Sequence, residues 1–254
     1  NTLGARIEGA GTDTLTIEGV SRLRPATRAY RIMPDRIETG TYLCAAAIAG
    51  GEITVTETDP ALLTSTLAKL EEAGCEVSTT VDSITVKREA PLKPFHLRTE
   101  PHPGFPTDMQ AQLMAVAAFA EGESVVEETI FENRFMHVAE LRRMGADIEE
   151  QGSIAHVRGG KPLEGAAVMA SDLRASAALV LAGLGAMGRT QVLRIYHLDR
   201  GYEDMVGKLR GVGACIGRVG DDVHDPALLD AAMGVSPELT AGGVHASQAA
   251  PAHA

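Results

Sequence analysis

The sequence predicts an α/β fold built from repeated units. A segment that ends in a glycine and runs into a strand pattern recurs at a nearly constant spacing, at Gly4, Gly74, Gly145 and Gly213. A fixed period of this kind is typical of a chain made from one repeated structural unit. Between these glycines the pattern has the order strand, helix, strand, helix and two strands, written βαβαββ. Tryptophan is absent and aromatic residues make up 4% of the chain, so we expect an aliphatic core.

The middle unit shows this pattern most completely. Segment 107–122 is rich in Ala, Met and Leu and predicts a helix, with Thr107 and Asp108 as candidate N-caps. Segment 132–145 carries apolar residues at i, i+3 spacing and predicts the second helix. Alternating patterns and a Gln-Gly turn predict strands within 95–99, 124–130 and 146–158.

The ends of the chain differ from the repeated part. Residues 1–22 read as the last third of a unit, so we expect the remnant of a preceding, similar domain, and we assign the three-unit domain to residues 23–220. The last unit has one strand pattern after its glycine where the others have two, which predicts a vacant strand position that a missing segment fills. Residues 221–254 hold five acidic residues and no Lys or Arg, and predict a disordered acidic tail.

Three glycines, Gly183, Gly185 and Gly188, match the dinucleotide-binding pattern G-x-G-x-x-G. That pattern binds a pyrophosphate only where a strand enters the glycine turn and a helix leaves it. Here the helical segment 172–185 comes first and the strand pattern 190–196 follows. We therefore predict that these glycines end a helix and allow close packing.

Composition excludes several other classes of function. A formal net charge of −11 disfavours general binding to nucleic acid or to anionic membranes. No apolar run reaches the roughly 18 residues of a membrane-spanning helix. The three cysteines have no C-x-x-C spacing, which is typical of buried, reduced thiols in the cytoplasm. The histidines lack the spacings of metal ligands, and there is no P-loop or G-x-S-x-G motif, so we expect neither a metal nor another cofactor.

Polar residues gather at the predicted starts of helices, where unpaired N–H groups and the helix dipole attract anions. In a repeated fold, equivalent helix starts lie at one end of the domain, so the clusters are expected to converge on one face. Arginines suit a substrate with two or more anionic groups, and a carboxylate among them suits a general base. The clusters contain Arg36, Asp108, Arg134, Asp172 with Arg174, and Asp199 with Arg200.

Each cluster also has a purely structural interpretation. Asp172 at a helix start is typical of an N-cap. Arg134 follows an acidic residue and is consistent with a surface ion pair of little energetic value. Asp199 and Arg200 are each able to pair with neighbouring charges. The recurrence at one structural position keeps a shared binding face open beside these alternatives.

At these clusters the sequence resembles the C-terminal part of the UDP-N-acetylglucosamine 1-carboxyvinyltransferases, which belong to the enolpyruvyl transferase family. The resemblance covers residues 3–219, and its motifs are "MPDRIETGTYL", "RTEPHPGFPTDMQAQ", "FENRFMHVAELRRMGA", "SDLRASAALVLAG" and "IYHLDRGYEDMVGKLRGVGA". It implies two similar domains, each an inside-out α/β barrel of three βαβαββ units with helices inside and sheets outside. It also implies transfer of the enolpyruvyl group of phosphoenolpyruvate to the 3-hydroxyl of UDP-N-acetylglucosamine with release of phosphate. This is the first committed step of cytoplasmic peptidoglycan synthesis, and hence of cell-wall growth, cell shape and division.

The resemblance further implies roles for individual residues. Asp108 would accept the proton of the attacking sugar hydroxyl, and Ile130 would contact the nucleotide sugar through its backbone. Arg134 and Arg174 would face the carboxylate of phosphoenolpyruvate, and Arg200 its phosphate. The implied reaction is an addition through a tetrahedral adduct followed by elimination of phosphate.

Two further residues complete the implied site, and a large part of the family's site lies outside this chain. Asp172 would orient the arginines and the reacting hydroxyl, and Arg36 would lie near the hinge between domains. The family's Lys-Asn pair, its mobile loop with a general-acid Cys and a nucleotide-binding Arg are not among these residues, and no cysteine of this chain matches the loop. We therefore expect an inactive C-terminal portion that needs the missing N-terminal domain. A free-standing regulatory half and a shikimate-pathway enolpyruvyl transferase are the alternatives.

Overall fold

The computed structural model describes residues 1–219, so the predicted tail at 221–254 lies outside the described residues. The chain divides into two compact units, with the boundary between Pro34 and Asp35. In the first unit, β1 (Arg6–Glu8) and β2 (Thr16–Glu18) form an antiparallel hairpin in which Ile7 is opposite Ile17. Residues 23–34, expected to begin the repeated domain, belong to this first unit and form no helix or strand.

The second unit contains three sheets. Strands β3 (Gly51–Thr56), β4 (Glu76–Thr79) and β5 (Ser83–Arg88) form an antiparallel sheet in the order β3-β5-β4. Strands β6 (His96–Arg98), β7 (Glu123–Glu127), β8 (Asp147–Gln151) and β9 (Ile154–Arg158) have the order β6-β7-β9-β8, and the β6–β7 pair is parallel. The third sheet is the parallel pair of β10 (Ala167–Met169) and β11 (Gln191–Leu193).

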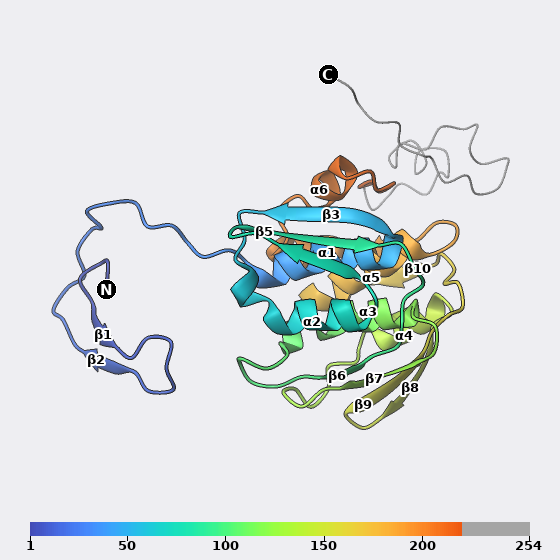
Figure 1. Cartoon of the computed structure of the whole chain (residues 1–254), viewed down its shortest axis with the longest axis horizontal. Helices are drawn as coiled ribbons and strands as arrows, with labels where there is room; N and C mark the ends of the chain where they lie inside the picture. Colours follow the sequence, from blue (N-terminus) through green and yellow to red (C-terminus); the bar gives the residue numbers. More distant parts are fainter. Residues whose placement is uncertain (220–254) are drawn as a thin grey trace, which may run out of the picture. The chain divides into compact units, whose positions relative to one another are not determined.

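Within residues 1–219, six α-helices accompany these sheets. Three of them are largely buried: α1 (Arg36–Ala49), α3 (Gln110–Ala118) and α5 (Leu173–Gly185). The other three are α2 (Thr64–Glu72), α4 (Val138–Arg143) and α6 (Met205–Gly211). In Figure 1 the β3-β5-β4 sheet and the four-stranded sheet lie on opposite sides of the helices. The predicted α/β class is confirmed.

The observed element order reproduces the middle predicted segment in full: β6, α3, β7, α4, β8, β9. The first segment has α1, β3, α2, β4 and β5 but lacks a leading strand within residues 23–34. The third has β10, α5, β11 and α6, and the strand expected within 214–219 is not formed. The predicted strand 190–196 was too long, since β11 ends at Leu193 and the next residue, Arg194, has a φ of 58°.

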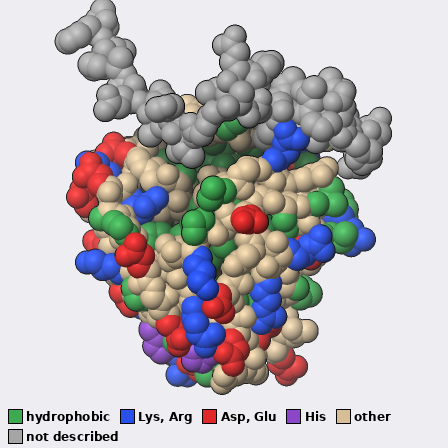
Figure 2. Space-filling view, turned by 90° about the vertical axis from the view of Figure 1, so that its right-hand side faces the viewer, with side chains coloured by type: hydrophobic (Ala, Val, Ile, Leu, Met, Phe, Trp, Pro, Cys, Tyr) green, Lys and Arg blue, Asp and Glu red, His purple; other side chains and the backbone are tan. Residues whose placement is uncertain are grey.

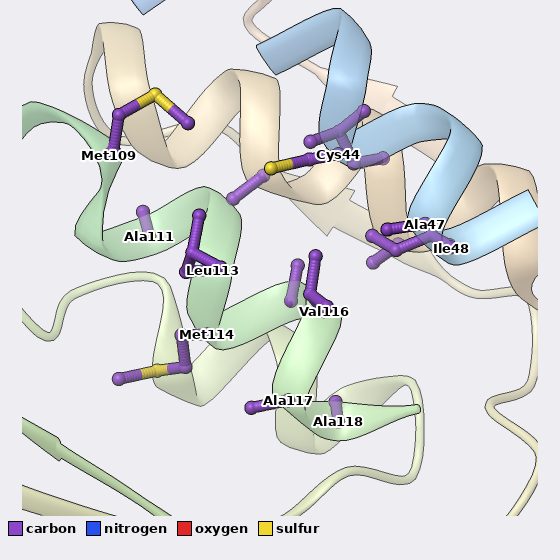
Figure 3. Close-up of a cluster of buried hydrophobic side chains, with 14 of the residues drawn as sticks. Cys44, Ala47, Ile48, Met109, Ala111, Leu113, Met114, Val116, Ala117 and Ala118 are labelled. Carbon is purple, nitrogen blue, oxygen red and sulfur yellow. The ribbon is translucent and has the colours of Figure 1, made fainter. Parts of the chain in front are cut away.

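Helices α1, α3 and α5 are buried on every side, which follows from their composition. All nine residues of α3 are buried, and so are eleven of the residues of α1. Alanine and other small side chains allow helix axes to approach closely, and a helix that is apolar all round is typical of a core position. Figure 3 shows Cys44, Ala47 and Ile48 of α1 facing Leu113 and Val116 of α3.

The glycine-rich segment at the end of α5 packs against this helical core. A Cβ atom on Gly185 would lie 2.6 Å from Cγ2 of Ile48 and 2.8 Å from the ring of Phe119, so any larger residue would clash. Gly188 has a φ of 78° in the turn that leads to β11. Helix α5 thus precedes the strand, and the prediction that these glycines end a helix is confirmed. Close packing is confirmed at Gly185 but not at Gly188, where a Cβ atom would meet nothing of residues 1–219 within 4 Å.

The cysteines only partly match the prediction of buried thiols. Cys44 and Cys75 are buried, and burial raises the pKa of the Cys75 thiol to about 11 and that of Cys44 further. Cys215 is exposed, so the prediction was wrong for this residue. Within residues 1–219, no helix is both long and apolar enough to cross a membrane.

Candidate functional site

The Asp108 carboxylate lies between two arginines that come from distant parts of the sequence. Arg134 Nη2 is 2.6 Å from Asp108 Oδ1, and Arg174 Nη2 is 3.1 Å from Oδ2. Asp108 belongs to the short 3₁₀ helix η2 (Thr107–Met109) that precedes α3. Three of the residues singled out from the sequence, from η2, from the loop before α4 and from α5, therefore meet at one carboxylate.

Local structure explains how each arginine reaches this carboxylate. Asp172 is the N-cap of α5, and its Oδ1 accepts the backbone N–H of Arg174 at 2.8 Å, which places Arg174 in the first turn. Arg134 precedes α4 and donates from Nη1 to Thr107 Oγ1 at 2.6 Å. Its guanidinium also lies 4.7 Å from the centre of the Phe131 ring, within the range of a cation–π contact.

The prediction that Thr107 and Asp108 cap the helix was wrong. Neither side chain caps η2 or α3, whose preceding residues Pro106 and Met109 make no side-chain cap bond. The physical reason is competition, because the two arginines take both oxygens of the Asp108 carboxylate. The structural alternative for Asp172, an N-cap, is what the structure shows.

The electrostatics of the site keep Asp108 ionised. Burial raises the pKa of the Asp108 carboxyl, but the hydrogen bond from Arg134 and the charge of Arg174 outweigh burial and lower it below its ordinary value. Burial lowers the pKa of Arg174, and its contacts with Tyr202 and Asp108 more than reverse this. The Asp108 carboxylate and the Arg174 guanidinium are therefore charged at neutral pH.

This lowered pKa predicts a pH dependence of stability. A carboxyl whose folded pKa is below its unfolded value of about 3.9 contributes stability above that pH, and this contribution is lost as the pH falls through the folded pKa. We expect the unfolding free energy of the wild type to exceed that of Asp108→Asn at pH 6, and the gap to shrink towards pH 3. Urea unfolding at a series of pH values measures it, and a gap that stays constant would contradict the assignment.

A buried hydrogen-bond network that was not predicted from the sequence holds the Arg174 guanidinium. Thr41 Oγ1 donates its hydrogen to the Ile37 carbonyl at 2.8 Å, so the Tyr202 hydroxyl, 3.0 Å from Thr41 Oγ1, must be the donor in that pair. The Tyr202 oxygen in turn accepts from Arg174 Nη1 at 3.3 Å. Gln112 Nε2 lies 3.1 Å from Thr41 Oγ1, which links α1, α3 and α5.

Tyr202→Phe removes this central hydroxyl and leaves the side chain's shape unchanged. Tyr202 is 2% exposed, so its partners cannot turn to water, and we expect the unfolding free energy to fall by about 1–3 kcal/mol. Chemical denaturation measures the change. Tyr196→Phe is the matched control, since Tyr196 is exposed and its loss should change stability by less than about 0.5 kcal/mol. Equal stabilities of the two variants would rule out a structural role for the network.

A second hydrogen-bond network, also not predicted from the sequence, is centred on the Glu128 carboxylate. Its carboxylate accepts hydrogen bonds from Thr99 Oγ1 and Thr107 Oγ1, both at 2.8 Å. It also accepts the backbone N–H groups of Ile130 and Phe131, at 2.9 and 3.2 Å. The strand alternation contained a signal for this residue, because Glu128 follows Ser124 and Val126 on the buried side of β7 and its continuation.

Of the remaining predicted site residues, Ile130 is joined to the central cluster only through its backbone N–H bond to Glu128, and Arg36 and Arg200 are not joined to it within residues 1–219. Arg200 ends the 3₁₀ helix η3 (Ile195–Arg200), and its exposed side chain forms no hydrogen bond or ion pair with residues 1–219. Its neighbour Asp199 pairs with Arg218, as the structural alternative allowed. Arg36 is the first residue of α1, directly after the boundary between the two units. Ile130 is 39% exposed.

His137 is a buried titratable group next to the cluster. Burial lowers its pKa to about 4, Asp172 opposes this and Arg134 adds to it, so the imidazole is neutral at physiological pH. Its Nε2 atom has no hydrogen-bond partner among residues 1–219. Within residues 1–219, no three His, Cys, Asp or Glu side chains are arranged to hold a metal ion.

A cavity of about 320 Å³ lies apart from the Asp108 cluster, between the second half of α5, β11, η3, α6 and residues 215–219. Its lining includes apolar side chains of each of these elements, such as Val180, Val192, Leu198 and Met205. On the face drawn in Figure 2, acidic and basic side chains lie next to one another and form no patch of a single sign.

Comparison with known proteins places this geometry in a family. The family model described as EPSP synthase (3-phosphoshikimate 1-carboxyvinyltransferase) matches residues 1–209. The UDP-N-acetylglucosamine 1-carboxyvinyltransferase of Aeromonas salmonicida is 58% identical over 220 residues, which cover 86% of this chain and 52% of that protein. The corresponding protein of Magnetococcus marinus is 56% identical over 219 residues, with the same coverage. The chain thus spans about half the length of the curated relatives it matches.

Solved structures agree on the fold. The enolpyruvyl transferase NikO of Streptomyces tendae superimposes with a TM-score of 0.74 at 33% identity, covering 84% of this chain and 51% of that one. An EPSP synthase of Acinetobacter baumannii, at 18% identity and a TM-score of 0.58, shares the fold over 76% of this chain and 45% of its own. The resemblance inferred from the sequence motifs is confirmed, and the chain belongs to the EPSP synthase family.

Proposed function

We propose that this chain is the C-terminal portion of an enzyme that transfers the enolpyruvyl group of phosphoenolpyruvate to the 3-hydroxyl of UDP-N-acetylglucosamine and releases phosphate. The single observation that carries the proposal is the Asp108 carboxylate bound by Arg134 and Arg174. It combines a proton acceptor with two cations suited to an anionic substrate. The names of the curated relatives favour this acceptor over shikimate 3-phosphate, since the EPSP synthase structure is only 18% identical.

The fold supports an inside-out barrel as the scaffold. We propose that segments 35–88, 96–158 and 167–219 are its three units, with α1, α3 and α5 in the centre and the sheets outside. Segment 96–158 has the full βαβαββ order, while the first lacks the leading strand and the third lacks the closing pair of strands. The burial of these three helices on all sides supports this arrangement. Residues 1–22 then belong to the end of a second, similar domain.

The chemistry follows from the charges. Arg134 and Arg174 bind the carboxylate of phosphoenolpyruvate, and Arg200 binds its phosphate. The sugar hydroxyl adds to C2 while the C3 methylene gains a proton from a group outside this chain, which gives a tetrahedral adduct. The C2–O bond to phosphate then breaks, a proton leaves C3 and the enol ether forms. Asp108 takes the hydroxyl proton, and the arginines stabilise the developing charge.

Because Asp108 is paired with both arginines, binding of an anionic substrate also changes the pKa of Asp108. An anion that binds to Arg134 and Arg174 competes with Asp108 for their N–H groups. Because these arginines hold the Asp108 pKa down, their withdrawal raises it and makes the carboxylate a stronger base. Binding of phosphoenolpyruvate therefore prepares Asp108 to accept the sugar proton.

Three further residues have supporting roles in this proposal. The Ile130 N–H donates to Glu128, so its carbonyl is the backbone group left for the nucleotide sugar. Asp172 caps α5 and so fixes the backbone at Arg174, and it helps to orient the reacting hydroxyl. Arg36 lies at the hinge between domains. This scheme requires neither a metal nor an organic cofactor.

The proposed partner is an N-terminal domain that supplies the Lys-Asn pair, the Cys loop and the nucleotide-binding arginine. We place the whole enzyme in the cytoplasm, in peptidoglycan synthesis, and thus in cell shape and division. The cavity beside β11 is where a strand of the remaining half would complete the third unit. Nucleic acid and membranes have no part in this function.

A chimera tests the proposal. The chain is joined to the N-terminal half of the Aeromonas salmonicida relative, and phosphate release from phosphoenolpyruvate is measured with each of two acceptors. We expect turnover with UDP-N-acetylglucosamine, none with shikimate 3-phosphate, and none by the 254-residue chain alone. A folded chimera without turnover would favour a non-catalytic, regulatory half, and turnover with shikimate 3-phosphate would favour the other transferase.

A further inference from the structure

Glu128 is a buried carboxylate that no basic side chain among residues 1–219 contacts directly. It is 2% exposed and follows the last residue of β7. One oxygen accepts from Thr99 Oγ1 and from two successive backbone N–H groups. The other accepts from Thr107 Oγ1 alone. A buried charge is costly unless hydrogen bonds satisfy it, and four donors do so here.

The bond to Thr107 fixes the direction of a hydrogen-bond relay. A threonine hydroxyl has one hydrogen, and Thr107 donates it to Glu128 Oε2 at 2.8 Å. The hydroxyl oxygen therefore presents only lone pairs to Arg134, whose Nη1 lies 2.6 Å away. With Nη1 held there, Nη2 lies 2.6 Å from Asp108 Oδ1.

Glu128 also acts on the same arginine by a second route. Its Oε1 holds the backbone N–H of Phe131 at 3.2 Å, and the Phe131 ring lies 4.7 Å from the Arg134 guanidinium carbon. The carboxylate thus fixes both the hydroxyl that binds one edge of the guanidinium and the backbone of the ring that covers one face.

We propose that Glu128 and Thr107 are positioning residues that set the Arg134 guanidinium against Asp108 and hold it ready for an anionic ligand. The ligand, phosphoenolpyruvate, rests on the proposed function, whereas the positioning of the arginine does not. Neither residue touches the ligand in this arrangement. Both act through Arg134.

The mobility of the Arg134 side chain in the full chain tests the proposal. Nitrogen-15 spectra of arginine side chains measure the rate of rotation about the Nε–Cζ bond, which is slow while Nη1 and Nη2 have different partners. Thr107→Val keeps the shape of the side chain but removes the hydroxyl. We expect rotation at Arg134 to become about tenfold faster, as for the loss of one hydrogen bond. An unchanged rate in a folded variant would overturn the proposal.

Three further variants separate positioning from a general loss of structure. Thr107→Ser restores the hydroxyl and should restore the slow rate. Thr85→Val removes a hydroxyl from the exposed Thr54–Thr85 pair and should leave Arg134 unchanged. Glu128→Gln must keep its oxygen towards the backbone N–H groups, so it turns an N–H towards Thr107 and leaves the threonine hydrogen without an acceptor. Glu128→Gln should therefore also speed rotation at Arg134. If Thr107→Val does not fold, the rotation rate in Glu128→Gln tests the proposal instead.

Titration with phosphoenolpyruvate, followed through amide chemical shifts, connects the relay to the ligand. We expect Thr107→Val to bind about tenfold more weakly than the wild type, and Thr107→Ser to bind within about twofold of it. Equal affinities would overturn the proposal that the relay prepares Arg134 for the anion. If the wild-type chain itself gives no shifts at millimolar ligand, the proposed binding of phosphoenolpyruvate by Arg134 and Arg174 fails, while the rotation rates still decide the positioning of Arg134.

Discussion

Asp108→Asn in the chimera is expected to reduce the rate of phosphate release by about 100-fold or more, the range expected for loss of a general base. Asparagine keeps the shape of the side chain, but it cannot accept a proton, and one of its two polar atoms becomes a donor that faces an arginine. The loss should appear in kcat, because Asp108 accepts the proton during the reaction and not when the substrates bind. Steady-state measurement of kcat and KM for both substrates checks it.

Asp147→Asn is the matched control. Asp147 on β8 is 44% exposed, close to the 40% of Asp108, and it lies 3.5 Å from Nη1 of an arginine, Arg158. It has the same type of ion pair but lies on an outer sheet. We expect its kcat to remain within about twofold of the unsubstituted chimera, since surface ion pairs contribute little. If both variants lost activity to the same extent, Asp108 would have no special role.

Gly185→Val is expected to have the largest effect on stability, a loss of about 3 kcal/mol in the free energy of unfolding. The first added carbon would already lie 2.6 Å from Ile48 Cγ2 and 2.8 Å from the Phe119 ring, so α1 and α5 would have to move apart. The better helix propensity of valine offsets only a few tenths of a kcal/mol. Urea unfolding of the full chain, followed by circular dichroism, measures the change.

Gly211→Val provides the comparison at a position with space. Gly211 is the last residue of α6, and a Cβ atom there would meet no atom of the described part of the chain within 4 Å. We expect this variant to change stability by less than about 0.5 kcal/mol. A Gly185→Val protein as stable as Gly211→Val would mean that the helices do not pack at Gly185 as described.

The sequence predicted the core and most of the element order because those depend on local pattern. The Ala-, Met- and Leu-rich composition of segment 107–122 predicted a helix, and its middle part, α3, is buried throughout. The strand expected within 23–34 was not recoverable in this way. A short strand depends on the neighbour with which it pairs, and the local sequence does not specify that neighbour.

The site was predicted in part for a similar reason. Asp108, Arg134 and Arg174 were found because they recur at the starts of successive helices. The local sequence also predicted that Asp108 caps the helix. It does not, because two arginines from distant segments bind its carboxylate in the folded chain. Tyr202 and Glu128 were missed because neither begins a helix. The sequence did contain a signal for Glu128, because this acidic residue occupies one of the alternate strand positions that face the core. An acidic residue at such a position indicates a buried polar network.

Helix α3 has a consequence for attempts to alter this protein. An ordinary surface helix offers half of its positions to random replacement at little cost, whereas all nine positions of α3 contact other parts of the core. A mutational scan should therefore find α3 intolerant along its whole length, without the three-to-four residue rhythm seen in amphipathic helices. Libraries meant to diversify this chain without unfolding it belong on the outward-facing residues of the strands.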